Sequence, residues 1–393
     1  MSVRRIGTTL LATAALLSFS LESDAATRVK NHSISHPSAA GSWQALNSMS
    51  AATSNFSLVS IGGGKVLAVN SLAPQIFDST TGQWSAAAPI GLLSAASPTA
   101  VTLADGRVLI SGGVGAVKTA RIYNPSLNTW TTTGSMKVGR YQHTATLLQD
   151  GRVLVTGGVA SGDSTSAELY DPATGTWALT ASMNNARVSG HVATLLADGT
   201  VLVTGGTGST ATPAEIFDPG SSTWGLTGVM VAARNGHNAS LLQNGKVLVT
   251  GGCGGYSLSK AIDGYDVTVG ASCRSTEIYD PALGTWQAAH SMKLPRASFS
   301  ATVMTNGKVL VAGGAVGCAS AAPTGIPLQI QQCLPTNSAE LYDPATDTWS
   351  WGPNMASAVE SQRAVLLGDG RVLLAGGSNG KSAVANAEAF TSN

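Results

Sequence analysis

Histidine and arginine side chains recur at matched places in the middle of the chain. His143, His191 and His237 each stand eight residues before the glycine of a turn, and Tyr141 lies near the first of them. Histidine and tyrosine can act as a general acid or base. Arginines precede these histidines and recur once more further on: Arg140, Arg187, Arg234 and Arg296. Because a guanidinium binds a carboxylate through two hydrogen bonds, this set could hold an anionic ligand such as a uronate, a sialic acid or an acidic peptide.

The N-terminal segment has the pattern of a secretory signal peptide. Arg4 and Arg5 precede an uncharged stretch over residues 6–21, and Ser23 and Ala25 provide the small residues of a cleavage site. The stretch is short for a membrane span. We therefore expect residues 1–25 to be removed and the protein to be secreted or periplasmic, with no membrane span.

Composition narrows the class of partner. The formal net charge is +1 and only 11% of the residues are charged. No basic field is therefore available to hold a phosphate backbone, and we do not expect nucleic acid as a partner.

Four cysteines stand in the second half of the chain, at Cys253, Cys273, Cys318 and Cys333. None of their spacings resembles a zinc pair, and in an exported protein four cysteines predict two disulfides. Three pairings are open. We favour Cys253 with Cys273 and Cys318 with Cys333, because each would close a short loop and stabilise the fold by about 3 kcal/mol.

These residues sit in a repeated unit. A turn, an apolar run and, in all but the degenerate first copy, a pair of glycines occur seven times, as in DGRVLVTGG at 150–158. Asp-Gly or Asn-Gly between two apolar runs favours a β-hairpin with a type I′ turn. The glycine pair lets the backbone turn or approach a neighbour where a Cβ would clash. A further strand, an Asp-Pro turn and a tryptophan follow, as in AELYDPATGTW, and the aromatic residues provide apolar area between stacked sheets.

The repeated Gly-Gly, Tyr-Asp-Pro and tryptophan signature resembles the kelch repeat family over essentially all of the mature chain. The resemblance implies an all-β, seven-bladed kelch-type β-propeller. The last unit stops before a tryptophan, and Trp43 stands in a strand with no unit before it, so we expect the N-terminal strand to close the last blade. The expected organisation is a signal peptide (1–25), a flexible N-terminal segment (26–40) and the propeller (41–393).

The resemblance leaves two roles open for the repeated arginines and histidines. An arginine followed by a histidine at the start of the innermost strand is common in kelch repeats. These side chains could therefore bond loop backbone or pair with the glutamates that recur in the units: Glu168, Glu215, Glu277 and Glu340. They could also line the channel mouth and contact a ligand.

The units differ most in the loops between the second and third strands of units five and six, which hold the four cysteines. Long irregular loops on a rigid scaffold often bind partners, and we expect Tyr256 and Tyr265 to make such contacts. Propellers that resemble this one often act as binding modules. We therefore expect a monomer that binds an extracellular glycan or protein through this loop face.

An enzyme is the alternative. A lyase or epimerase acting on an acidic sugar would need an acid/base group and an arginine, which Tyr141, His191 and Arg234 could supply. A copper radical oxidase similar to galactose oxidase is less compatible with the sequence. It needs a tyrosine crosslinked to a cysteine, whereas the four cysteines here are better paired with one another. We therefore expect neither a metal nor a cofactor.

Overall fold

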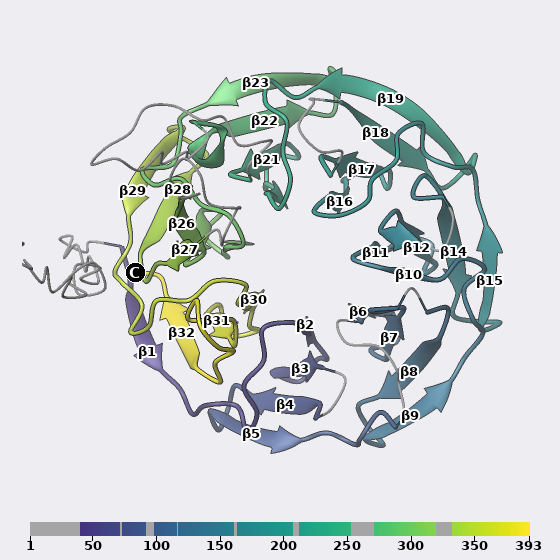
Figure 1. Ribbon diagram of the computed structural model, residues 1–393, viewed down its shortest axis with the longest axis horizontal. Helices are drawn as coiled ribbons and strands as arrows, with labels where there is room; N and C mark the ends of the chain where they lie inside the picture. Colours follow the sequence, from purple (N-terminus) through teal and green to yellow (C-terminus); the bar gives the residue numbers. More distant parts are fainter. Residues whose placement is uncertain are drawn as a thin grey trace, which may run out of the picture. The chain divides into compact units, whose positions relative to one another are not determined.

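The computed structural model describes residues 40–70, 73–91, 98–115, 117–160, 163–206, 212–252, 271–319 and 332–393. This part of the chain forms seven four-stranded sheets that stand as blades around a common axis (Figure 1). The predicted all-β, seven-bladed propeller is therefore confirmed. No helix in these ranges is long and apolar enough to cross a bilayer. The predicted signal peptide lies outside the described residues.

The blades follow one another along the chain. The first blade contains β2 (Ser57–Ser60), β3 (Lys65–Val69), β4 (Gln75–Asp78) and β5 (Gln83–Ala86). The second contains β6 (Thr99–Thr102), β7 (Val108–Ser111), β8 (Ala120–Asn124) and β9 (Thr129–Thr132). The third contains β11 (Thr144–Leu147), β12 (Val153–Thr156), β14 (Ala167–Asp171) and β15 (Thr176–Leu179). The next two contain β16 (Val192–Leu195), β17 (Val201–Thr204), β18 (Pro213–Asp218) and β19 (Thr223–Val229); β20 (Asn238–Leu241), β21 (Val247–Thr250), β22 (Thr276–Asp280) and β23 (Thr285–Ala289). The last two contain β24 (Ser300–Val303), β25 (Val309–Ala312), β28 (Ala339–Asp343) and β29 (Thr348–Trp351); β30 (Arg363–Leu366), β31 (Val372–Ala375), β32 (Ala387–Thr391) and β1 (Ser42–Ala45).

Three short elements lie outside the blades. They are the ladder of β10 (Arg140–Tyr141) with β13 (Val159–Ala160), the ladder of β26 (Ala315–Ala319) with β27 (Gln332–Pro335), and a 3-10 turn, η2 (Ala271–Arg274).

The ring closes as expected. β1, the first strand of the described chain, pairs antiparallel with β32 and places Trp43 opposite Phe390. We call the first strand of each blade an inner strand: β2, β6, β11, β16, β20, β24 and β30. Each inner strand contacts the inner strands of both neighbouring blades, including the pair β2 and β30. The N-terminal strand therefore completes the seventh blade, and no blade is left with an open gap beside it.

Each blade begins with a tight hairpin, but the turn differs from the predicted type I′. Positive φ occurs at the glycine, as at Gly151 (φ 88°), and not at Asp150 before it. The amide of Gly151 donates to the carbonyl of Leu148, and the amide of Leu148 donates to the carbonyl of Arg152. The loop is therefore a three-residue loop, 149–151, that ends in a left-handed glycine, which is the next most common hairpin solution.

The core lies between neighbouring blades. β12 is buried along its whole length, and the other second strands are buried apart from the exposed Lys65 that begins β3, because a second strand faces a neighbouring blade on both sides. Tyr170 on β14 packs against Trp177 on β15 with ring centroids 4.9 Å apart. The Trp177 Nε1 donates to the carbonyl of Gly134 in the preceding blade at 2.8 Å. Five other tryptophans make the same kind of bond, at Trp43, Trp130, Trp224, Trp286 and Trp349. The predicted structural role of the aromatic residues therefore agrees with the packing.

The glycine pair lies where adjacent blades come closest. A Cβ built on Gly157, which has φ 60°, would lie 2.6 Å from the carbonyl oxygen of Arg187 and 3.0 Å from the His191 ring. A Cβ on Gly158 would meet the backbone of Tyr141 and His143. Close approach, as expected from the sequence, therefore explains the pair.

Candidate functional site

The repeated arginines lie inside the blades. Their side chains are 0–1% exposed, and each pairs with the recurring glutamate of its own blade. The distances are 3.0 Å for Arg140–Glu168, 3.0 Å for Arg187–Glu215, 2.7 Å for Arg234–Glu277 and 3.1 Å for Arg296–Glu340. Of the two roles that the sequence leaves open, this geometry favours the structural one, because no guanidinium reaches the surface.

The Arg296 contacts show how such a pair organises a blade. Its guanidinium donates to the carbonyls of Gly313 and Ser338, to the Ser338 hydroxyl and to the Glu340 carboxylate. Glu340 also accepts bonds from the amides of Lys293 and Leu294. The Arg296–Glu340 pair therefore links the segment that leads into the sixth blade to its third strand, β28, and to the end of its second strand, β25.

The three histidines join adjacent blades. The Nε2 atoms of His143 and His237 lie 3.0 Å and 2.7 Å from the Ser111 and Thr204 hydroxyls of the preceding blades. His191 Nε2 lies 3.1 Å from the Thr156 carbonyl and donates to it. Burial lowers the pKa of His143 and His237 to about 3 and that of His191 to about 4. The imidazoles are therefore neutral near pH 7 and are held as inter-blade contacts.

The histidines do not converge on a metal. Among the described residues, no group of three or more histidine, cysteine, aspartate or glutamate side chains comes together in a way that could hold an ion. Each ring uses its Nε2 toward a different blade, so the donor set of a copper centre is not assembled by these residues. Tyr141, which the enzyme alternative places beside His143, is half-buried in the β10–β13 ladder.

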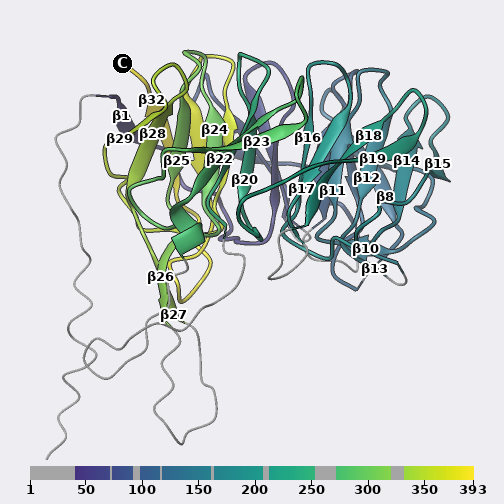
Figure 2. The same cartoon turned by 90° about the horizontal axis from the view of Figure 1, so that it is seen from above.

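The loops between the second and third strands form one end of the ring, which we call the b–c face. Antiparallel pairing places these loops opposite the hairpin turns. The segments that lead into the inner strands reach this face too, because Ala297 and Glu360 form bridges with Ala315 and Ser378, which follow second strands. The β10–β13 and β26–β27 ladders lie on the same side of the ring (Figure 2). The units therefore differ from one another mainly on this face.

The predicted loop residues are described only in part. Cys253, Tyr256 and Tyr265 lie outside the described residues. Cys273 is 3% exposed and is not a free thiol. β26 and β27 pair Val316 with Leu334 and Ala319 with Gln332, with a register shift between these pairs, so Cys318 and Cys333 lie within the same irregular stretch of the ladder. This register is compatible with the sequential pairing, which stays a prediction.

Two charged residues at the seventh blade were not singled out from the sequence. Arg363 is exposed at the first position of β30, where the other inner strands carry uncharged residues. Glu388 takes the place of the paired glutamates, but Val359 stands where the arginine would be, and burial raises the pKa of Glu388. The signal in both cases was a departure from the repeat rather than the repeat itself.

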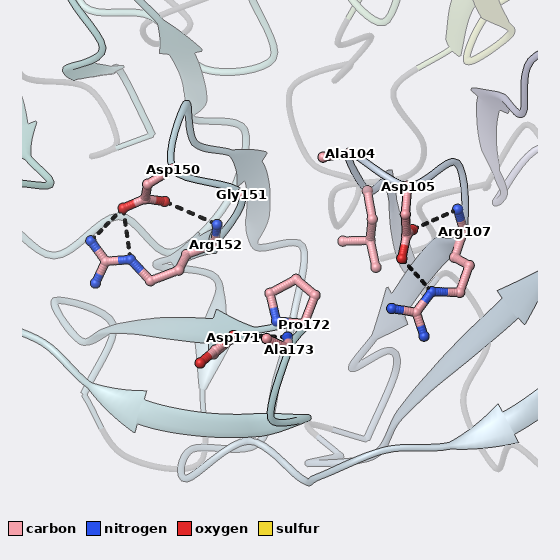
Figure 3. A pocket seen from close by; sticks show the side chains of 10 residues that line it. Ala104, Asp105, Arg107, Asp150, Gly151, Arg152, Asp171, Pro172 and Ala173 are labelled. Atoms are coloured by element: carbon pink, nitrogen blue, oxygen red, sulfur yellow. Dashed lines mark hydrogen bonds and ion pairs between the residues drawn. The ribbon is translucent and has the colours of Figure 1, made fainter.

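The other end of the ring, the turn face, carries two shallow pockets between blades. One, of about 280 Å³, is lined by the hairpin turns around Asp105 and Asp150 and by the Asp171–Pro172 turn (Figure 3). The second, of about 430 Å³, continues toward Asp198. In the first pocket, Asp105 and Asp150 bind the arginine of their own turn, as Figure 3 shows. The carboxylates of Asp105 and Asp150 are therefore paired with arginines inside their own turns.

Comparisons with known proteins agree with the fold. A profile of the kelch motif matches residues 140–184 and 296–356. An F-box/kelch-repeat protein of Arabidopsis thaliana is 35% identical over 100 residues, which are 24% of this chain and 18% of the plant protein. The chain thus matches less than a fifth of that relative's length.

The solved structures include a fungal alcohol oxidase of the AA5 family, in complex with copper. It superposes with a TM-score of 0.71 at 18% identity, over 90% of this chain and 76% of the oxidase. At that identity the likeness shows the fold alone. Kelch propellers are generally interaction modules. The seven closed blades and the two kelch motif matches together identify the described chain as a seven-bladed β-propeller that contains kelch motifs.

Proposed function

We propose that the protein is an exported binding module that holds an extracellular glycan or protein through its b–c face. The asymmetry of that face carries the proposal. The blades share one backbone plan, to which the sixth blade adds the β26–β27 ladder and the third blade the shorter β10–β13 ladder. Binding residues are found disproportionately on loops that a rigid scaffold positions.

The state of the ionisable groups supports binding over catalysis. The four buried arginines are neutralised by glutamates, and burial keeps the three histidines neutral. A general acid or base works best when its pKa lies near the working pH. The histidines that the enzyme alternative would use have pKa values far below neutral pH.

The test measures binding of residues 26–393 on a glycan array and in an extracellular-protein interaction screen. Turnover of the same sugars is followed in parallel. A matched variant replaces residues 320–331 by a short turn between β26 and β27. A second variant alters the turn face by exchanging Asp105 and Arg107 for serine. We expect binding without turnover, lost in the first variant and kept in the second.

Two results would overturn the proposal. Turnover of an acidic sugar would establish the lyase or epimerase instead. Binding that survives the loop replacement but is lost on the turn face would move the site to the other end of the ring. The intact mass of the exported protein, measured without reduction, tests the cleavage after residue 25 and the two disulfides at the same time.

A further inference from the structure

The inner strands are uncharged except at one place. Across all seven of them, which the structure describes in full, Arg363 is the single charged residue. The residues at its position in the seven blades are Ser57, Thr99, Thr144, Val192, Asn238, Ser300 and Arg363. The ring therefore carries one guanidinium in a layer of small, mostly polar side chains.

Residues of this layer bond to the next blade. Ser57 Oγ donates to the Pro98 carbonyl at 2.8 Å, and Asn238 Nδ2 donates to the Phe299 carbonyl at 3.1 Å. Arg363 makes the equivalent bond through Nε, which donates to the Phe56 carbonyl at 3.0 Å. That bond orients the guanidinium across the junction between the seventh and first blades.

The inter-blade bond leaves most of the guanidinium unused. Among the described residues, neither terminal amino group of Arg363 has an acceptor and no carboxylate forms an ion pair with it. Glu360, three residues earlier, does not pair with it either. A serine or asparagine would make the same bond to the next blade, so the structural contact does not require an arginine.

Arg363 combines solvent exposure with partial desolvation of its guanidinium. The residue is exposed, yet desolvation by the surrounding protein lowers the pKa of its guanidinium. Exposure and desolvation occur together when solvent reaches a side chain that is surrounded by many protein atoms. This cation has lost part of its hydration without gaining a counter-ion from the described residues, so an anion that binds there is favoured.

We propose that Arg363 binds the carboxylate of an acidic sugar, of the uronic acid type, at the axis of the ring on its b–c face. This rests on the proposed binding function and assigns its ligand class. The two terminal amino groups, which have no acceptor among the residues that the structure describes, present the planar pair of donors that a carboxylate accepts. One guanidinium binds one carboxylate, so a single uronate unit of a glycan is enough to occupy it. Uncharged polar side chains in the same layer suit the hydroxyl groups of a sugar.

Titration calorimetry with oligogalacturonates and with neutral galactose oligomers of the same length tests this assignment. The proteins are the wild type, Arg363→Gln, Arg363→Lys and the control Arg107→Gln, which removes a cation from the turn face. Circular dichroism and thermal unfolding verify that each variant is folded. We expect the wild type to prefer the acidic oligomer at least tenfold, Arg363→Gln to lose that preference, and Arg107→Gln to keep it.

Arg363→Lys separates charge from geometry. It keeps the cation but loses the paired donors, so we expect an affinity between those of the wild type and Arg363→Gln. Equal binding of the acidic oligomer by the wild type and Arg363→Gln would overturn the assignment. A wild type that binds a neutral glycan or a protein but no uronate would overturn it too, while leaving the proposed binding function standing. Preference for a polyglutamate peptide over the uronate would replace the sugar by a peptide ligand.

Discussion

Replacing Arg296 by methionine tests whether the repeated arginines are structural. The change removes five hydrogen bonds from a guanidinium that is 0% exposed. It leaves Glu340 buried with only the two amides of Lys293 and Leu294 as donors. Breaking a buried ion pair by removing one partner costs about 3 to 5 kcal/mol. The two remaining amide bonds keep part of the carboxylate satisfied, so we expect the lower half of that range.

Urea unfolding followed by tryptophan fluorescence measures this cost. The control is Arg107→Gln, which breaks the exposed pair with Asp105 and should cost less than about 1 kcal/mol. The double variant Arg296→Met, Glu340→Gln leaves no buried charge, so it should be more stable than Arg296→Met alone. A loss for Arg296→Met no larger than that for Arg107→Gln would refute the structural role.

Three further predictions concern the buried groups and the close blade contacts. Because burial depresses the pKa of the three ring histidines, the unfolded chain binds more protons below pH 6.5, so stability should fall as the pH falls from 6.5 toward 4. His237→Gln should lower that slope by up to about 1.4 kcal/mol per pH unit, measured by urea unfolding at a series of pH values. Val359→Arg should supply the missing partner of Glu388 and lower the raised pKa of its carboxyl. The loss of stability that this carboxyl causes as the pH rises through its pKa should then disappear. An unchanged dependence of stability on pH would argue against the pairing. Gly157→Ala should cost at least about 2 kcal/mol more than Gly151→Ala in thermal unfolding, since both glycines have positive φ but only the first has backbone within 3 Å of its Cβ.

The repeat was sufficient to predict the ring but not the details of its turns. Asp-Gly is compatible with a two-residue type I′ turn and with a three-residue turn that ends in a left-handed glycine. The pairing of Leu147 with Val153 decides for the longer loop, and that register is not visible in the dipeptide. Closure was predictable because the final unit lacks its tryptophan strand and Trp43 lacks a preceding unit.

The candidate site was less accessible to sequence reasoning. The repeated Glu168 and its equivalents signalled a structural partner for Arg140, but the burial of the pair depends on how blades stack. Arg363 and Glu388 belong to no repeated pattern of paired residues, so the repeat does not point to them. In a repeat protein whose shared residues pack the blades together, the residues that depart from the repeat are the better guide to function.

Hydrogen–deuterium exchange of the protein with and without its bound ligand tests most directly which face binds. The probe is the oligogalacturonate, or the glycan or protein that the array and the interaction screen select. The account predicts added protection in β26 and β27 and in residues 359–366, with exchange unchanged at the hairpin turns 103–107, 148–152 and 196–200. Protection confined to those turns, where the two pockets lie, would contradict it.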